Sequence, residues 1–328
     1  MNKILISGCV GYIGSILCKT LIEKNYSVIG LDNFSCSNIG DISPDIDFYE
    51  GCISDESLIQ KITSKHKIDL VIHLASFRSA EESTYESKKY LDNNLTNSIA
   101  FLNSLYLNKV NNIVFASTAA VYGSCQSEDL SEDSKLSPNS PYAESKLKFE
   151  KHLSNFNKTH SDFNFITLRL FNVSGSYGEL GERHEPETHL IPCAVDALLQ
   201  NKELNLYGKN FQTKDGTAVR DYVHVLDVAS SFINAGNLLI DNKLEFTNKT
   251  YNIGSAKTFS NLEIIKLIEK LSDKKLKYKF TKAKAGDLPS LKANNSVAIQ
   301  AGVLQLGNSS IEKIVKDNLD FRSKYLKN

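Results

Sequence analysis

The feature that most constrains this chain is an alternation of short apolar runs with helical repeats, which continues from residue 3 to residue 170. The apolar runs have the length of buried strands and stand at Lys3–Ser7, Ser27–Leu31, Asp47–Tyr49, Leu70–Leu74, Asn112–Ser117 and Phe165–Leu170. Between them, apolar residues recur at the spacing of one helix face. Strands and helices that alternate in this way form a parallel sheet with helices on both faces. The sequence therefore predicts an α/β fold with a doubly wound parallel sheet.

The pattern becomes looser after about Asn172. Residues 174–187 are rich in Gly, Glu and Ser and predict a long loop, a length that is usually functional in compact domains. Helices are expected at about Thr188–Gln200, Asp227–Leu239 and Leu262–Leu271, and from Ser310 onward. We expect a first domain over residues 1–173, with residues 227–250 packing back on it, and a smaller α/β domain over residues 174–328.

Composition excludes several classes of protein. The 38 basic and 38 acidic residues give a formal net charge of zero, which argues against a general binder of nucleic acid or anionic membranes. No apolar stretch approaches the roughly 20 residues that span a bilayer. The six cysteines form no C-x-x-C pattern, so neither a zinc site nor a disulfide framework is indicated, and we expect no metal. We interpret the chain as a cytoplasmic protein with reduced thiols.

Three glycines, Gly8, Gly11 and Gly14, follow the first apolar run and open the first helical repeat. Such glycines allow a tight turn and let backbone amides approach a pyrophosphate at the helix N-terminus. The second run ends in Asp32, whose carboxylate can accept hydrogen bonds from ribose hydroxyls and would repel a 2′-phosphate. The spacing is G-x-x-G-x-x-G, so a glycine turn of another α/β protein is the alternative. In this context, we interpret the first domain as a Rossmann-like, NAD-binding domain.

Two side chains with a common helix face are candidates for proton transfer. Tyr142 and Lys146 stand four residues apart in a helix that Pro141 is well placed to begin. A nearby ammonium favours the phenolate and lowers the pKa of tyrosine from about 10. By itself, the pair also fits an ordinary exposed amphipathic helix. A hydroxyl from Ser117 or Thr118, at the end of a central strand, would face the same crevice as the glycines, although a simple turn is the alternative.

The glycine turn, the strand-end hydroxyl and the downstream Tyr-x-x-x-Lys, in this order, resemble the extended branch of the short-chain dehydrogenase/reductase superfamily. The resemblance implies that Thr118, Tyr142 and Lys146 form the catalytic set and that Lys146 contacts the nicotinamide ribose. It also implies an NAD site assembled from several strand ends. Its expected residues are Gly8, Gly11, Tyr12, Ile13, Gly14, Asp32, Asn33, Ile53, Leu74, Ala75, Arg78, Asn94, Ser117, Tyr142, Lys146 and Phe171.

The second half narrows the resemblance. Residues 168–172 (LRLFN), 187–192 (ETHLIP), 214–229 (KDGTAVRDYVHVLDVA) and 286–289 (GDLP) are similar to signature stretches of the UDP-glucose 4-epimerases. This resemblance implies NAD-dependent epimerisation at C4 of a UDP-hexose through a transient 4-keto intermediate, in a homodimer formed by the helix before Asn108 and the Tyr142 helix. The implied substrate-binding residues are Thr118, Tyr142, Asn172, His189, Leu190, Arg220, Lys284, Asp287 and Leu291.

Two of these assignments have alternatives, and some positions depart from the family's pattern. Arg220 would pair with the diphosphate, unless it forms a salt bridge with Asp221 or Asp227. Asp287 would meet the uridine ribose, unless it only shapes a turn. The departures are Cys52 for an Asp that contacts adenine, Arg78 for a frequent Lys, Lys284 for an Arg, and Leu291 for a bulky Tyr of some members. The smaller Leu291 leads us to expect that N-acetylated UDP-hexoses are admitted.

Other readings share the fold. Nucleotide-sugar dehydratases and decarboxylases resemble this chain, but they carry acidic residues after the strand-end Thr, where Ala119 and Ala120 stand here. A non-catalytic NAD sensor of the same superfamily is a further alternative, although such proteins typically lose the Tyr or the Lys.

Overall fold

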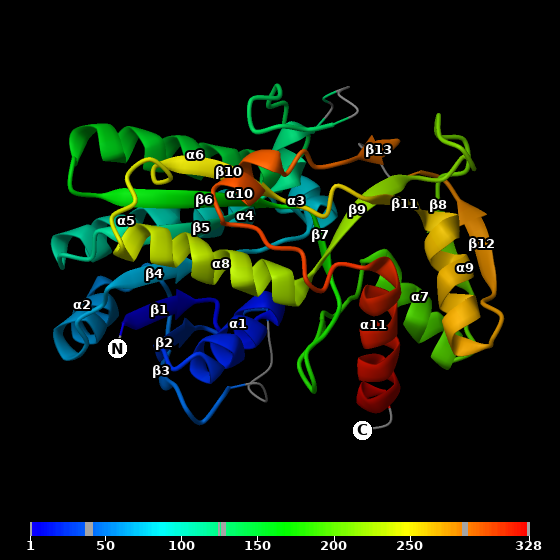
Figure 1. Ribbon diagram of the computed structural model, residues 1–328, viewed down its shortest axis with the longest axis horizontal. Coiled ribbons are helices and arrows are strands. Elements are labelled where there is room, and N and C mark those ends of the chain that lie inside the picture. Colours follow the sequence, from blue (N-terminus) through cyan, green and yellow to red (C-terminus); the bar gives the residue numbers. More distant parts are fainter. Residues whose placement is uncertain (1, 37–41, 124, 126–128, 284–287, 327–328) are drawn as a thin grey trace.

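The main sheet has seven strands in the order β10-β6-β5-β4-β1-β2-β3, in a computed structural model that describes residues 2–36, 42–123, 125, 129–283 and 288–326 (Figure 1). Every neighbouring pair runs parallel. The strands are β1 (Lys3–Ser7), β2 (Ser27–Asp32), β3 (Asp47–Glu50), β4 (Leu70–His73), β5 (Asn112–Thr118), β6 (Asn164–Leu170) and β10 (Lys249–Ile253). The predicted doubly wound α/β fold is confirmed, and the six predicted strands agree with β1 to β6 within a residue or so. The edge strand β10 was not predicted.

Alternate residues of each central strand face opposite layers of helices. Ile4 and Ile6 of β1 belong to one apolar core with α1 (Tyr12–Glu23) and α8 (Val225–Ile240). Leu5 belongs to the other core, with α2 (Glu56–Lys65), α5 (Asn97–Leu107) and α6 (Pro141–Thr159). Because successive strand side chains point to opposite faces, apolar runs are required on a sheet that is covered on both sides.

The helical region that the sequence predicts from about Lys88 to Asn108 is confirmed, since the chain before β5 is helical from Ser87 to Leu107. The structure has α3 (Ala80–Tyr85), α4 (Ser87–Leu91), a π-helical turn at Asp92–Thr96, and then α5. Within the π turn, the buried Asn94 side chain accepts from the Phe77 amide and donates to the Phe77 carbonyl, both at 2.9 Å. The wider turn therefore coincides with an anchor for the segment that leaves β4.

A smaller unit lies beyond the carboxyl ends of the main strands (Figure 1). It contains two small sheets, β11-β9-β13 with β7 added to β9, and β12-β8. The strands are β7 (Asn172–Ser174), β8 (Leu204–Tyr207), β9 (Val219–His224), β11 (Thr258–Ser260), β12 (Tyr278–Thr281) and β13 (Ser290–Leu291). The helices α7 (Leu190–Leu199), α9 (Asn261–Ser272) and α11 (Ile311–Tyr325) share a third apolar core. The short helix α10 (Ser296–Gln300) packs near β10.

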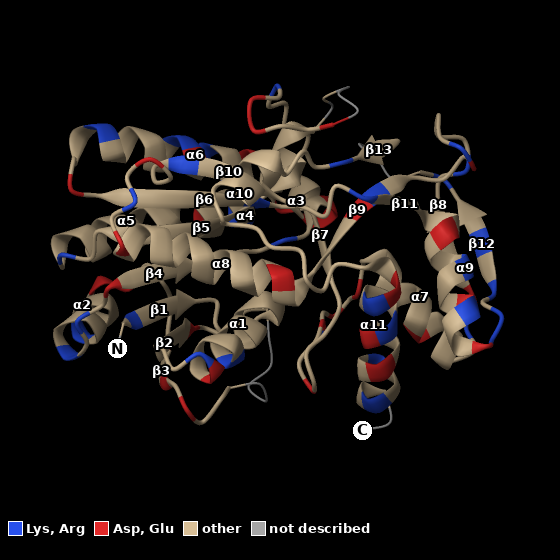
Figure 2. Cartoon of the chain, in the orientation of Figure 1, with Lys and Arg blue, Asp and Glu red and all other residues tan. Residues whose placement is uncertain are grey.

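Charged side chains of both signs are interspersed on the outer helices. Figure 2 shows this pattern along α9 and α11, in keeping with the zero net charge. Among the residues described above, none of the helices is long and apolar enough to cross a membrane.

Candidate active site

A cavity of about 370 Å³ opens where the main strands end and the smaller unit begins. Its wall includes Gly8 after β1, Asp32 at the end of β2, Leu74 after β4, Thr118 at the end of β5 and Leu170 at the end of β6. Open parallel sheets bind ligands outside the carboxyl ends of their strands, so this cavity is in the expected place.

The glycine turn forms one end of the cavity. Gly8 has a φ of +79°, and its amide donates to the Leu31 carbonyl at 2.8 Å. A Cβ on Gly14 would lie only 2.1 Å from the Gly8 oxygen, so helix α1 can approach the turn only with glycine there. A Cβ on Gly11 would meet nothing nearer than that oxygen at 3.5 Å. Gly11 caps α1 without a side-chain hydrogen bond, so the first amides of the helix remain available to a ligand.

Asp32 is held rigidly beside this turn. Its two carboxylate oxygens accept from the Val10 amide at 3.0 Å and from the Phe34 amide at 2.9 Å. Each oxygen has a further lone pair, so the carboxylate can still accept from a hydroxyl in the cavity.

Helix α6 brings Tyr142 and Lys146 to the opposite side, as the spacing predicted. Pro141 occupies the first turn, and the Ser140 hydroxyl accepts from the Ala143 amide at 3.3 Å. The Lys146 ammonium donates to the Ala116 carbonyl at 2.9 Å and lies 4.8 Å from the centre of the Phe115 ring. Burial lowers the pKa of Lys146 to about 7, although the Glu150 carboxylate acts in the opposite direction.

Burial raises the pKa of Tyr142, while a hydrogen bond with the Thr118 side chain and the charge of Arg78 act against the rise. This differs from the expectation that Lys146 lowers the pKa of Tyr142 in the protein itself. The physical reason is that Lys146 is buried and Tyr142 is partly buried in the cavity wall, and desolvation disfavours the charged form of each. The phenol and the ammonium are still in the wall of one cavity.

The two candidate hydroxyls at the end of β5 are separated by the alternation of the strand. Ser117 is buried and donates to the Glu150 carboxylate, which also pairs with Arg169 at 2.7 Å. Thr118 accepts from the Ala120 amide at 3.1 Å and contacts Tyr142. Thr118 is therefore the hydroxyl that faces the tyrosine, and Ser117 belongs to a buried network.

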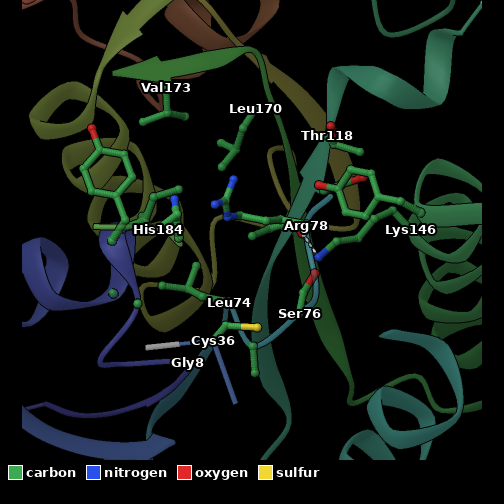
Figure 3. A pocket seen from close by; sticks show the side chains of 18 of the residues that line it. Gly8, Cys36, Leu74, Ser76, Arg78, Thr118, Lys146, Leu170, Val173 and His184 are labelled. Atoms are coloured by element: carbon green, nitrogen blue, oxygen red, sulfur yellow. Dashed lines mark hydrogen bonds between the residues drawn. The ribbon is translucent and has the colours of Figure 1, made fainter. Parts of the chain in front are cut away.

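Arg78 reaches into the middle of the cavity, between Thr118 and Lys146 on one side and His184 on the other (Figure 3). A guanidinium in this position can bind phosphate or carboxylate groups. The far wall comes from the smaller unit and from the loop before α7, and includes Asn172, Val173, Glu182, His184, His189 and Leu291.

Most of the side chains predicted from the sequence meet in this cavity. Those that line it are Gly8, Gly11, Tyr12, Ile13, Gly14, Asp32, Asn33, Ile53, Leu74, Ala75, Arg78, Ser117, Thr118, Tyr142, Lys146, Phe171, Asn172, His189 and Leu291. Three predicted residues do not line it: Asn94 binds the Phe77 backbone, Leu190 packs against the third core, and Arg220 donates to the Val219 and Leu288 carbonyls at 2.9 and 2.8 Å. Lys284 and Asp287 lie outside the described residues.

Asp221 and Asp227 are the two carboxylates with which Arg220 could alternatively form a salt bridge. Asp221 accepts from the amides of Ser255, Ala256 and Ala293. Asp227 accepts from the amides of residues 307 and 308 and from the Ser309 hydroxyl. Asp227 also accepts from the side-chain amide of Asn308 at 2.8 Å, so both carboxylates are held by several neutral donors.

Sequence reasoning missed two polar residues of the far wall, Glu182 and His184. Both lie in the predicted long loop, where no periodicity marks a side chain as buried or exposed. The one available signal was a repeated Glu-x-His pattern, Glu182-x-His184 and Glu187-x-His189.

Comparison of the sequence with known protein families identifies the family of this chain. Residues 4–254 match the NAD dependent epimerase/dehydratase family. The chain belongs to this family. NAD is therefore its cofactor, as the glycine turn and Asp32 predicted.

Relatives from this family are similar to the chain over nearly their whole length. The UDP-glucose 4-epimerase of Lacticaseibacillus casei is 36% identical over 317 residues, which cover 95% of this chain and 94% of that protein. The crystal structure of UDP-glucose 4-epimerase from Brucella ovis in complex with NAD has a TM-score of 0.92 at 31% identity and covers 98% of both chains. The UDP-Glc/GlcNAc 4-epimerase from Campylobacter jejuni has a TM-score of 0.84 at 30% identity, with 99% of this chain and 100% of that chain covered.

The residues of this epimerase/dehydratase fit its cofactor. The open backbone at Gly11 and the free amides of α1 suit a pyrophosphate, and the remaining lone pairs of Asp32 suit ribose hydroxyls. The Lys146 ammonium and Tyr142 at the other end would border the nicotinamide. Cys52, which stands in place of an Asp, also lines the cavity and is 3.1 Å from the Ser54 hydroxyl.

Proposed function

We propose that the protein is a UDP-hexose 4-epimerase that interconverts UDP-glucose and UDP-galactose. The observation that carries this proposal is the meeting of Tyr142, Thr118 and Lys146 in one wall of the cavity, opposite the polar residues of the smaller unit. The reaction oxidises the hexose at C4 and reduces the resulting 4-keto sugar from its other face, so no net oxidation occurs.

Different residues of the cavity would carry out the proton transfer and stabilise the charge that it creates. Bound NAD supplies a reversible acceptor for the hydride of C4. Tyr142 takes the proton of the 4-hydroxyl, directly or through Thr118, and returns it after the sugar has turned. Positive charge beside Tyr142, from Lys146 when protonated and from Arg78, offsets part of the cost of forming a buried phenolate.

The wall beside Tyr142 favours epimerisation over dehydration or decarboxylation. Ala119 and Ala120 line the cavity next to Thr118, where the dehydratases and decarboxylases carry acidic residues. Among the described lining residues, the carboxylates are Asp32, at the glycine turn, and Glu182, which is hydrogen-bonded to His184. Neither has a described contact with Tyr142, and epimerisation needs no acid besides the tyrosine.

We propose further that the N-acetylated pair, UDP-N-acetylglucosamine and UDP-N-acetylgalactosamine, is accepted. Leu291 in β13 lines the cavity and leaves room that a tyrosine ring would fill. The similar structure from Campylobacter jejuni is described as a UDP-Glc/GlcNAc 4-epimerase, which supports this choice.

We also propose that the enzyme is a homodimer, associated through the helices of residues 80–107 and α6. Two large apolar side chains of this region are exposed, Tyr85 at the end of α3 (83%) and Leu107 at the end of α5 (78%). Light scattering after size-exclusion chromatography tests the proposal; a monomer at micromolar concentration would contradict it.

The function is tested by incubating the purified protein with UDP-galactose and following UDP-glucose by chromatography, without added NAD. Formation of UDP-glucose without a stoichiometric change in NADH absorbance is expected. A 6-deoxy-4-keto nucleotide sugar would show a dehydratase, and release of CO2 from UDP-glucuronate, supplied in a separate incubation, would show a decarboxylase. Tight NAD binding without turnover of either nucleotide sugar would show a sensor.

A further inference from the structure

Two glutamates and two histidines converge in the loop between β7 and α7. The four residues, Glu182, His184, Glu187 and His189, each offer one ligand atom, and these atoms all lie within 4.8 Å of one another. The Nδ1 atom of His184 is 2.8 Å from Glu182 Oε1, and the Nδ1 atom of His189 also contacts this oxygen. The Nδ1 atom of His189 is 3.9 Å from Glu187 Oε1. We refer to these four residues as the loop cluster.

The loop cluster buries two carboxylates that the described protein groups satisfy only in part. Glu182 is 2% exposed, and its Oε2 atom has no hydrogen-bond partner. The Oε2 atom of Glu187 also lacks one, and the Glu187 side chain is 9% exposed. Burying a carboxylate without full pairing costs several kcal/mol per ion, on the order of magnitude found for buried charges. A positive charge is therefore expected between the two glutamates.

The guanidinium of Arg322, in α11, is engaged mainly by groups outside the loop cluster. It forms a two-pronged contact with Asp196 and donates to the Glu182 backbone carbonyl at 2.8 Å. Its distance to Glu187 Oε2 is 3.9 Å, which is an ion pair without a hydrogen bond. Among the described contacts, the carboxylates of the loop cluster thus face two imidazoles, and the Oε2 atoms of Glu182 and Glu187 have no hydrogen-bond donor.

We propose that the loop cluster binds one divalent transition-metal ion, with zinc as the preferred ion. Imidazole nitrogens and carboxylate oxygens are zinc ligands, and four of them complete a tetrahedral structural site. Bonds of about 2.0–2.1 Å in tetrahedral geometry place neighbouring ligand atoms about 3.3 Å apart. The separations of 2.8 and 3.9 Å lie on either side of this value, so small side-chain movements would form the site.

The site would tie the long loop to both units of the protein. His189 immediately precedes α7, and the ring of His184 packs edge-on against Tyr12, the first residue of α1, with centroids 6.4 Å apart. A bound ion would fix the far wall of the cavity relative to the glycine turn. It would take no part in the reaction. The His189 side chain is 54% exposed, which provides a path for the ion.

The proposal is tested by metal analysis of the untagged, NAD-bound enzyme. After chelator treatment, the enzyme is reloaded with zinc or cobalt(II), dialysed, and analysed by elemental mass spectrometry and visible absorption. We expect about one zinc per chain, and tetrahedral cobalt bands of the type given by nitrogen and oxygen ligands. The variants His184→Gln and Glu182→Gln should bind zinc at least about tenfold more weakly, while the control His160→Gln, at the end of α6, should bind it as wild type does.

The same samples serve as controls for misfolding of the variants and for metal binding by cysteine. Far-UV circular dichroism and NAD content identify a variant that has failed to fold; if Glu182→Gln fails, His184→Gln on the loop carries the test. Wild-type enzyme that retains no zinc, equal zinc binding by wild type and folded His184→Gln, or a cobalt–thiolate charge-transfer band from cysteine would each overturn the proposal. None of these results would affect the proposed epimerase activity.

Discussion

Lys146 and Glu150 lie one turn apart on α6, yet the Glu150 carboxylate pairs with Arg169 at 2.7 Å, and the Lys146 ammonium donates to the Ala116 carbonyl at 2.9 Å. The lysine is 4% exposed. Among the residues that the structure describes, it is therefore buried at the cavity without a direct ion-pair partner, and burial lowers its pKa to about 7. This arrangement lets Lys146 lose its proton close to neutral pH.

Stability should depend on pH through Lys146. Between about pH 7 and 10.5, the unfolded chain holds a proton that the folded chain has released, so this group makes the unfolding free energy rise with pH. The unfolding free energy of wild type minus that of Lys146→Met should increase by about 2 kcal/mol between about pH 7 and pH 9. Urea denaturation of both proteins, after removal of NAD, measures the difference. A difference that does not change with pH would show that Lys146 titrates elsewhere.

Removing the phenol of Tyr142 should stop the reaction and leave binding intact. The ring of Tyr142 packs edge-on against Tyr90, with centroids 6.4 Å apart, so Tyr142→Phe preserves its packing. Since general acid–base catalysis contributes roughly 10²- to 10⁴-fold, we expect kcat for UDP-galactose to fall by at least this factor. NAD content and UDP affinity, measured by calorimetry, should stay within about twofold. Unchanged turnover would refute the role of Tyr142.

The three-glycine turn offers a matched pair of substitutions. Gly11→Ala adds a methyl group that lies 3.5 Å from the Gly8 oxygen, an ordinary contact, so the protein should fold. The methyl would meet the pyrophosphate, so NAD affinity should fall by about tenfold or more. Gly14→Ala places the methyl 2.1 Å from the Gly8 oxygen, and should destabilise the fold by more than about 2 kcal/mol. Thermal denaturation and fluorescence titration with NADH separate the two effects. Equal stability losses would contradict this assignment.

Leu291 should control access of the N-acetyl group. A tyrosine at this position extends into the cavity, so Leu291→Tyr should lower kcat/KM for UDP-N-acetylgalactosamine by about tenfold or more and change the value for UDP-galactose by less than about threefold. The control is Ser290→Tyr, because neighbouring strand residues point to opposite faces and Ser290 is exposed. If wild type refuses the acetylated sugar, the inference from Leu291 is wrong.

Arg78 should bind the charged groups of the ligands. Its guanidinium lies in the middle of the cavity, and hydrogen bonds to charged groups contribute about 1.5–3 kcal/mol (Figure 3). We expect Arg78→Gln to weaken binding of NAD or of UDP by about 10- to 100-fold, and to reduce the salt dependence of that binding. Lys88→Gln, which removes an exposed cation of α4, is the control. Wild-type affinities for both nucleotides in Arg78→Gln would exclude the role.

The central sheet and the shared position of Tyr142 and Lys146 in the cavity wall were predictable from the sequence because each follows a local rule. Buried strands require apolar runs, and a spacing of four places Tyr142 and Lys146 on one helix face. The strand β10 follows no such rule, since its sequence KTYNI mixes polar and apolar residues at a sheet edge. The direction of the Tyr142 pKa shift was also beyond the sequence, because it depends on how completely the folded chain excludes water.

The polar residues contributed by the loop before α7 were the hardest to predict. Glu182 and His184 belong to no periodic segment, and only the path of the loop brings them against the glycine turn. Arg220 shows the converse: the resemblance implied a phosphate-binding role, whereas in the structure the guanidinium donates to the backbone carbonyls of Val219 and Leu288.

The position of β10 limits how such an enzyme can acquire new substrates. The chain leaves the main sheet after β6, builds β7 to β9, returns as α8 and β10, and leaves again for β11 to β13. Helix α8 packs beside α1, and β10 pairs with β6 at the edge of the main sheet. The smaller unit therefore cannot be separated from the larger one by cutting the chain at a single point. Transplanting a substrate-binding unit from a relative would need several junctions at once. New specificity is therefore more accessible through replacement of individual wall residues than through exchange of modules.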